Sequence, residues 1–338
     1  MLNQWNLFLA MARKRNKKKK QLKPSIYIAC EGTNTERIYL EAIAKQKDVF
    51  ERFEIEIYPS KTQQIKALNK EGESIKTDAI NLVKIAREYG SDCDEVWAVF
   101  DKDGYTKHEK AFENAKKRGR SKKVVNIAFS SIAIEHWILL HYEQNKTAFN
   151  KSQDVINYLS EKSYFIDNPK DENTPIYSQL QYKTETAIQN AAWLRMEMKT
   201  EVEANDGKFY ELNPYVTVDE LVRKLLNFKH VTYGKINQIV GIAQISIKVN
   251  SSQQNQNLLT INLTIINHQN IGYLIKNSNQ DFCVTNELGD SFPMSNANSE
   301  LIDSDTEKNI TLNFSITNSS SNLKVNFIRG DRQIIIDL

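Results

Sequence analysis

The stretch Asp94–Gly104 constrains the fold of this chain most, because it predicts a strand that is buried on both faces. Its centre, Val96–Phe100, holds five consecutive apolar residues, four of them aromatic or β-branched. Such runs are typical of parallel sheets, which helices cover on both sides. The run ends in Asp101-Lys102-Asp103-Gly104. Two carboxylates therefore leave one strand end on the same side, at the edge where open α/β sheets bind ligands.

These two carboxylates admit two interpretations. Neighbouring acids repel each other unless a cation lies between them, and the usual cation is a hard divalent metal with oxygen ligands. A solvated Asp-Lys-Asp-Gly turn is the plainer alternative. The rest of the chain bears on this choice.

Predicted strands and helices alternate around this stretch. The predicted strands are Ser25–Cys30, Phe53–Tyr58, Val96–Phe100 and Val124–Phe129, and the predicted helices are Glu36–Ala44, Ile75–Tyr89, His108–Arg118 and Ile132–Tyr142. Alternation of this kind requires crossover connections and predicts a parallel sheet. The region Lys151–Leu226 predicts a helical extension of three or four helices, with a loop at Asp167–Thr174. We therefore expect an α/β fold with flanking helices.

Two further acids have unusual settings. Glu31 stands at the end of the first predicted strand, just before a helix that Thr33 or Asn34 can cap, and Thr33 with Glu36 has capping-box spacing. Glu135 lies in the apolar run Ile132–Tyr142, and a buried carboxylate needs a cation, a basic side chain or amide donors. If Glu135 begins the helix, it can simply cap neighbouring amides. Both interpretations of Glu135 stay open.

Length and charge suggest two domains and a basic N-terminal region. The chain has 338 residues and a net charge of +3. The basic excess lies before Lys235, where 38 Lys and Arg face 33 Asp and Glu, whereas 7 Lys and Arg face 9 Asp and Glu from Lys235 onward. The densest basic run spans Arg13–Lys23 and includes Arg13, Lys14, Arg15, Lys17 and Lys18. It can contact phosphates, and a disordered solubilising tail is an equally good interpretation.

The cysteines and the apolar segments indicate the cellular compartment in which the protein is expected. Three scattered cysteines, Cys30, Cys93 and Cys283, form neither a disulfide framework nor a zinc spacing, so we expect a reducing cytoplasm. The apolar segment Met1–Ala10 precedes its positive charges, which is the wrong order for a secretory signal, and Met1 and Met11 are both possible starts. No run has the length of a membrane span, so no membrane partner is expected.

The composition changes abruptly after Gly234. Residues 235–338 contain 17 asparagines in 104 positions and about seven short alternating runs. That pattern predicts an all-β, immunoglobulin-like sandwich. We expect a basic tail over residues 1–23, an α/β domain over 24–234 and the sandwich over 235–338. The acids Asp303, Asp305 and Glu307 share one loop of the sandwich and are expected to be solvated.

Several of these motifs occur together in a known family. The chain resembles the RloB family, which is similar to the Toprim-fold enzymes, including topoisomerases, primases and overcoming-lysogenization-defect nucleases. The resemblance covers about residues 11–226 and excludes the sandwich. Ile134 stands where Phe is commoner, and the short spacing after Tyr182-Lys183 leaves the role of Lys183 open. Four motifs carry the resemblance: Glu31–Glu36, Phe100–Gly104, Ile134–His141 and Asn213–Val218.

The resemblance implies a Toprim-like active site. Glu31 would act as general acid or base. Asp101 and Asp103 would hold Mg²⁺ or Mn²⁺, with Glu31 and Glu135 as further ligands or orienting groups, and Lys183 would join the catalytic set. Eight Lys and Arg residues between Lys107 and Lys123, with Lys122 and Lys123 at their end, would guide a polyanion.

The expected function is that of a Mg²⁺-dependent nuclease in defence against phage, with an ABC/AAA-type ATPase as partner, as the resemblance implies. The substrate stays open between DNA and RNA, transfer RNA included. A non-cutting sensor or recruiting subunit is one alternative, and a nucleotide-signal phosphotransferase is another. The β domain is expected to dock a partner or trigger. The sequence leaves monomer and homodimer open.

Overall fold

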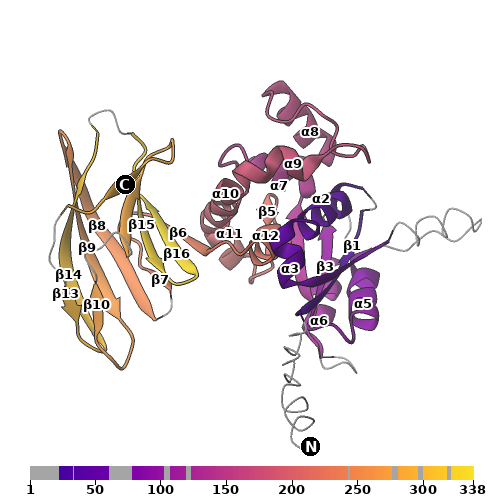
Figure 1. Cartoon of the computed structure of the whole chain (residues 1–338), viewed down its shortest axis with the longest axis horizontal. Helices are drawn as coiled ribbons and strands as arrows, with labels where there is room; N and C mark the ends of the chain where they lie inside the picture. The colour runs from indigo at the N-terminus through magenta and orange to yellow at the C-terminus, as the bar shows by residue number, and fades with distance from the viewer. Residues whose placement is uncertain are drawn as a thin grey trace, which may run out of the picture.

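A computed structural model describes residues 23–32, 34–60, 78–102, 107–118, 123–242, 244–275, 281–295, 300–317 and 321–338. It contains an α/β module followed by a β-rich module, joined through one strand (Figure 1). Within these described ranges, no helix is long and apolar enough to cross a membrane.

The α/β module is built on a five-stranded sheet. Its strand order is β2-β1-β3-β4-β5. The first four strands are parallel, and the short β5 runs antiparallel to β4. The parallel sheet predicted from the sequence is thus confirmed. The strands are β1 (Ser25–Cys30), β2 (Glu54–Tyr58), β3 (Glu95–Asp101), β4 (Asn126–Ser131) and β5 (Tyr215–Val216).

Strand β3 occupies the centre of this sheet and is buried on both faces. Trp97 and Val99 point toward one apolar core, whereas Val96, Ala98 and Phe100 point toward another. This alternation follows from the two-residue period of a strand. Helices α2 (Thr35–Ala44) and α7 (Ile134–Leu140) contribute to the first core, and α5 (Ala79–Tyr89) and α6 (His108–Lys116) contribute to the second.

Further helices follow α7. The region 151–226, fully described, contains five α-helices, whereas the sequence predicted three or four. The number is higher because short helices lie between the longer ones. The loop predicted at Asp167–Thr174 lies between α8 and α9. A short helix, α3 (Lys47–Arg52), precedes β2. The five helices are α8 (Ser152–Glu161), α9 (Ile176–Leu180), α10 (Thr184–Glu197), α11 (Lys199–Ala204) and α12 (Val218–Leu226), with 3₁₀ turns η1 (Gln181–Lys183) and η2 (Phe209–Glu211).

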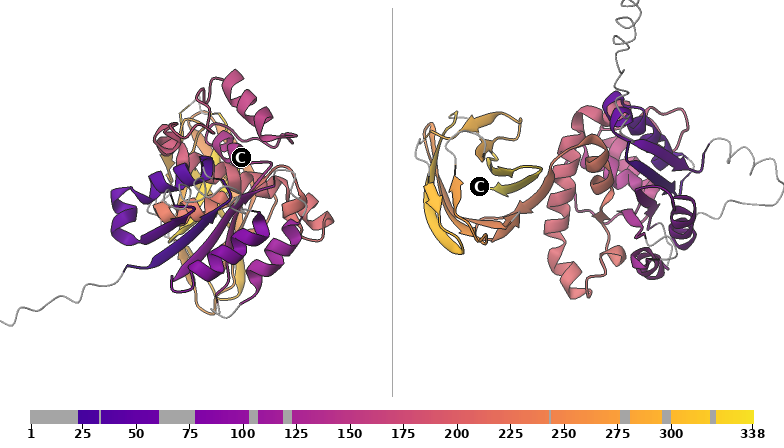
Figure 2. Two further views of the ribbon diagram at one scale, coloured as in Figure 1. Left: turned by 90° about the vertical axis from the view of Figure 1, so that its right-hand side faces the viewer. Right: turned by 60° about the horizontal axis from the view of Figure 1, so that its bottom comes forward.

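The second module is β-rich, as predicted. Its sheets have the orders β12-β11-β15-β16-β6, β14-β9-β8-β7 and β10-β13, and they enclose one apolar core. Figure 2 shows the sheets curving around that core. The strands are β6 (His230–Gly234), β7 (Val240–Ile242), β8 (Ile245–Asn255), β9 (Leu258–Asn267), β10 (Tyr273–Ile275), β11 (Phe282–Thr285), β12 (Ser291–Pro293), β13 (Glu300–Ile302), β14 (Thr306–Ser315), β15 (Lys324–Arg329) and β16 (Arg332–Asp337).

The β-rich sheets begin earlier than the composition suggested. Strand β6, which the sequence placed at the end of the α/β region, pairs in parallel with the last strand, β16. Val231 and Tyr233 of β6, with Ile335 of β16, also belong to the larger core of the α/β module. The two modules therefore share apolar contacts at this strand, although their sequence compositions differ sharply.

Candidate functional site

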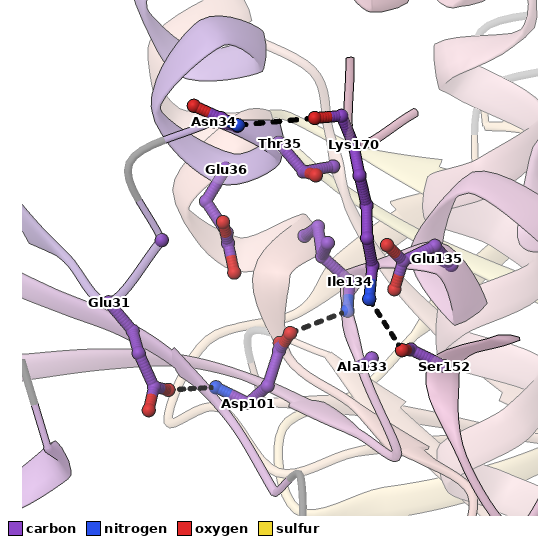
Figure 3. Close-up of a pocket in the computed structure, with 11 residues that line it drawn as sticks. Glu31, Asn34, Thr35, Glu36, Asp101, Ala133, Ile134, Glu135, Ser152 and Lys170 are labelled. Carbon is purple, nitrogen blue, oxygen red and sulfur yellow. Dashed lines mark hydrogen bonds between the residues drawn. The ribbon is translucent and has the colours of Figure 1, made fainter. Parts of the chain in front are cut away.

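A cavity of about 280 Å³ lies at the carboxyl edge of the parallel sheet. Four acids from four elements line it: Asp101 ends β3, Glu31 follows β1, Glu36 is the second residue of α2, and Glu135 is the second residue of α7. Figure 3 shows Glu36, Asp101 and Glu135 converging from different sides. The topology produces this convergence, because the carboxyl ends of parallel strands share one edge.

Backbone amides fix two of the acids. The Asp101 amide donates to Glu31 Oε2 at 3.0 Å, which ties the exit of β1 to the end of β3 (Figure 3). The Ile134 amide donates to Asp101 Oδ2 at 3.0 Å. Asp101, rather than Glu135, therefore caps the first amide of α7. The Glu135 side chain lines the cavity instead.

Burial and mutual repulsion make the cavity unfavourable for Asp101 as an anion. Desolvation, followed by the charges of Glu36, Glu135 and Glu31, raises the pKa of Asp101 well above its ordinary value, although the Ile134 amide works in the opposite direction. Glu36 and Glu135 are 6% and 1% exposed. The cavity thus concentrates negative charge that a bound cation would stabilise.

Gly32 provides the space for Glu36. A Cβ atom placed on Gly32 would lie 1.9 Å from Glu36 Oε2, far inside van der Waals contact. The helix start also differs from the predicted capping arrangement. Asn34 occupies the N-cap position of α2 but makes no side-chain cap bond to the helix. Glu36 lines the cavity, and Thr33 lies outside the described residues.

The loop between α8 and α9 lines a further part of the cavity. Lys170 Nζ donates to Ser152 Oγ at 2.7 Å, and both residues line the cavity. Asn34 Nδ2 donates to the Lys170 carbonyl at 3.1 Å, and Thr35 Oγ1 donates to the Pro169 carbonyl at 3.0 Å. The start of α2 therefore holds this loop against the acids.

The structure brings together three of the predicted site residues: Glu31, Asp101 and Glu135. Lys183 lies elsewhere, with its Nζ 4.1 Å from the centre of the Tyr142 ring, beyond the end of α7 that is distant from Glu135. The remaining predicted site residues lie outside the described residues: Asp103, Arg13, Lys14, Arg15, Lys17, Lys18 and Lys122.

Lys123 is described and lies away from the cavity. It is close enough to Asp94 for an electrostatic interaction, and Asp94 immediately precedes β3. Asp101 ends the same strand. Seven residues of extended chain span roughly 20 Å, so Lys123 lies about that far from the acids.

Sequence reasoning missed Glu36 and Lys170. Glu36 had a signal, since it closes the Glu-Gly-x-x-x-Glu motif, but its capping-box spacing favoured a structural role. Lys170 had none, because it lies 69 residues beyond Asp101 in a loop whose path no periodicity predicts.

The donor set of the cavity fits a hard cation. Within the described ranges, no three His, Cys, Asp or Glu side chains are close enough together to form a ready-made metal site. Asp103, the fifth acid, lies outside those ranges. Carboxylate oxygens are nevertheless the ligands that Mg²⁺ and Mn²⁺ prefer. Burial, and then the charges of the neighbouring acids, raise the pKa of Asp101, and a bound cation would favour its ionised form.

A second cavity, of about 350 Å³, lies between α10 and strands β6 and β7. Its guanidinium, Arg195, is engaged by Asp219 through two hydrogen bonds of 2.6 and 2.8 Å. Its other lining includes Met196, Ile239 and Val240. This cavity therefore lacks the converging acids of the first and marks the junction of the modules.

Three solved structures show a distant likeness to this chain. The yjhA protein from Bacillus subtilis is 11% identical and has a TM-score of 0.27, covering 31% of this chain and 98% of its own. A conserved hypothetical protein from Bacillus anthracis is 6% identical, with a TM-score of 0.21 and coverage of 29% and 93%. Pseudomonas fluorescens alkylpurine DNA glycosylase AlkC, bound to DNA, is 9% identical, with a TM-score of 0.20 and coverage of 77% of both chains. These scores carry no argument about this chain.

Family-level similarity is more informative. No curated protein matches the chain. The family model described as RloB-like protein, however, matches residues 26–225, which is more than half of the chain. The match contains the whole carboxylate cavity, from Glu31 to Lys170. The chain therefore belongs to the RloB-like protein family.

Proposed function

We propose that this protein is a metal-dependent nuclease that cleaves phosphodiester bonds in DNA or RNA. One observation carries the proposal: Glu31, Glu36, Asp101 and Glu135 come from four elements and line one cavity at the ligand-binding edge of a parallel sheet. Acids gathered in this way are suited to hold a divalent cation beside a phosphate. The resemblance to Toprim-fold enzymes supports the same chemistry.

Each residue of the cavity has a role in this proposal. Asp101, Glu36 and Glu135 would hold Mg²⁺ or Mn²⁺, and Asp103 remains a candidate ligand. The bound ion would supply electrostatic stabilisation of the charge that develops on the phosphate. Glu31, oriented by the Asp101 amide, moves a proton at its carboxylate to or from the attacking or leaving oxygen.

The wider setting of the proposal rests on the family. RloB-like proteins are expected beside an ABC/AAA-type ATPase in phage defence, so we propose an ATPase partner and a defence role. The basic run, with Arg13, Lys14 and Arg15, would add phosphate contacts. The β-rich module would dock the partner or the trigger, since the four acids of the proposed active site all come from the α/β module.

Incubation of the purified chain with Mg²⁺ and plasmid DNA, total RNA or transfer RNA tests the proposal. We expect cleavage of at least one substrate, and Asp101→Asn should abolish it. Asp94→Asn is the matched control, because Asp94 precedes the same strand at its opposite end and bonds to Ser25. Cleavage by Asp101→Asn at the normal rate would contradict the assignment. Metal binding without any cleavage would favour a non-cutting sensor or a nucleotide phosphotransferase.

A further inference from the structure

We propose that Lys170 is the anion-binding residue of the cavity and that its ammonium contacts a non-bridging oxygen of the bound phosphate group. The inference deepens the proposed function and rests on it for the identity of the phosphate as part of a phosphodiester. The ligand class is defined by charge and size: a tetrahedral phosphate oxyanion beside the acids.

The position of Lys170 is the first ground. Among the described residues that line the cavity, Lys170 carries the single positive charge, facing four carboxylates. Its side chain runs alongside Glu135 toward Ser152, on the side of the cavity opposite Glu31 (Figure 3). A group entering the cavity therefore lies between Glu31 on one side and the Lys170 ammonium, with Glu135 beside it, on the other.

The anchoring of the loop is the second ground. Two side chains from the start of α2, Asn34 and Thr35, hold the carbonyls of Lys170 and Pro169. Within the loop, the Lys170 amide donates to Asn168 Oδ1 at 3.0 Å, and Thr174 Oγ1 donates to the Asn168 carbonyl at 2.7 Å. Lys170 is thus an exposed side chain on a backbone that is held both by α2 and by bonds within the loop. This is the arrangement expected of a positioned binding group.

The charge balance is the third ground. Four carboxylates repel a phosphate strongly, and one divalent cation offsets two of those charges. A phosphodiester with its own negative charge needs a further positive group in the same cavity. Lys170 supplies it within the described lining, because Lys183 lies over the Tyr142 ring instead. The place in the catalytic set that the resemblance implied for Lys183 therefore fits Lys170 better.

Calorimetric titration of the full-length protein with inorganic phosphate, in the presence of Mg²⁺, tests the inference. Lys170→Gln removes the charge but keeps a donor for Ser152, and it should weaken phosphate binding roughly 10- to 100-fold, the range for a lost charged hydrogen bond. Lys170→Arg should bind within about threefold of the unmodified chain, since the charge remains. Lys162→Met, an exposed lysine beyond the far end of α8, is the control and should bind normally.

Ser152→Ala separates binding from loop support. It removes the hydrogen bond of 2.7 Å and leaves the ammonium, so its loss of phosphate affinity should be smaller than that of Lys170→Gln. Equal losses in both variants, accompanied by equal drops in melting temperature, would show a structural role and overturn the inference. Normal phosphate binding by Lys170→Gln, or no phosphate binding by the unmodified chain, would also overturn it. Phosphate binding without nucleic-acid cleavage would leave the inference standing and count against the nuclease alone.

Discussion

Gly32 and Glu36 form a pair in which one residue makes room for the other. A side chain at position 32 would overlap the Glu36 carboxylate, whose nearest oxygen is 1.9 Å from the position of the added Cβ. Glu36 is a flexible side chain, so the overlap would displace it rather than unfold the helix. The cavity would then lose one of its acids.

Gly32→Ala should therefore weaken Mg²⁺ or Mn²⁺ binding about as much as Glu36→Gln does. The double variant should be little weaker than either single variant, because both changes remove the same ligand. Calorimetry of the three variants checks this. Independent, additive losses would show that Gly32 and Glu36 act separately.

His141 makes the stability of the α/β module depend on pH. It is 1% exposed, its Nδ1 lies 2.9 Å from the Trp137 carbonyl, and its ring packs edge-on against Trp137. Desolvation lowers the pKa of His141 to about 4. The unfolded chain has a histidine pKa of about 6.5, so it binds more protons than the folded chain between pH 4 and 6.5. Stability therefore falls as the pH drops through that window.

Urea unfolding at pH 7 and at pH 4.5 measures this effect. His141 should account for a loss of about 2 to 3 kcal/mol between these pH values. His141→Gln should lose less stability than the unmodified chain over the same interval, whatever its stability at pH 7. His268→Gln, at an exposed histidine of the β-rich module, serves as control. Identical pH slopes for His141→Gln and the unmodified chain would refute the assignment.

Helices α10 and α12 are joined by a buried ion pair. Arg195 donates to both carboxylate oxygens of Asp219 at 2.6 and 2.8 Å and to the Val216 carbonyl at 2.8 Å. Asp219 is 2% exposed. Removal of one partner from such a pair leaves an uncompensated buried charge.

Arg195→Met should lower the free energy of unfolding by about 3 to 5 kcal/mol. Lys199→Met is the control on the neighbouring helix, where an exposed lysine lies 3.8 Å from Glu203, and it should change stability by less than about 1 kcal/mol. Denaturant titration gives both values. An Arg195→Met protein as stable as the control would mean that Asp219 finds another partner.

Elements with a clear hydrophobic pattern could be predicted from the sequence, and elements too short to show one could not. The centre of β3 was predictable because its five apolar residues fit a doubly covered strand, and the structure buries all of them. The helical region was less so: α9 and α11 have five and six residues, too short for a clear helical period. The pairing of β6 with the β-rich sheets was not predictable, because its partner β16 lies about 100 residues later in the chain.

Site residues could likewise be predicted only where a local sequence pattern marked them. Glu31 and Asp101 were predictable because each stands where a predicted strand ends, and parallel strands bring such ends together. Glu135 was predictable because it interrupts an apolar helix. Lys170 reaches the cavity through a loop whose shape depends on bonds from Asn34 and Thr35, and no local pattern encodes such bonds.

The two modules meet at β6. The Tyr233 hydroxyl donates to Asp337 at 3.0 Å and accepts from Lys324 at 2.6 Å and from Gln144 at 3.3 Å. Glu197 at the end of α10 accepts from Lys146 and Lys235. The α/β and β-rich modules are thus connected by a polar network as well as by apolar packing.

Truncation after Phe228 would remove the β-rich module and the contacts of Val231, Tyr233 and Ile335 with the α/β core. We expect the truncated chain to fold and to keep its metal binding, because the cavity is lined by residues between Glu31 and Lys170. Its melting temperature should be lower, because the apolar side chains that packed against the β-rich module become exposed. Full burial of one large apolar side chain stabilises a protein by about 1.5 to 3 kcal/mol. Circular dichroism on heating measures the difference. An insoluble or unfolded product would show that the modules depend on one another for folding.

The proposed function depends on metal binding by the acids at the edge of the sheet. Calorimetric titration of the full-length chain with Mg²⁺ tests this binding most directly. The unmodified chain and Asp94→Asn should bind the ion equally, because Asp94 lies at the opposite end of β3. Asp101→Asn should lose binding while its circular dichroism spectrum stays unchanged. Equal binding by Asp101→Asn and Asp94→Asn would contradict a metal site in this cavity.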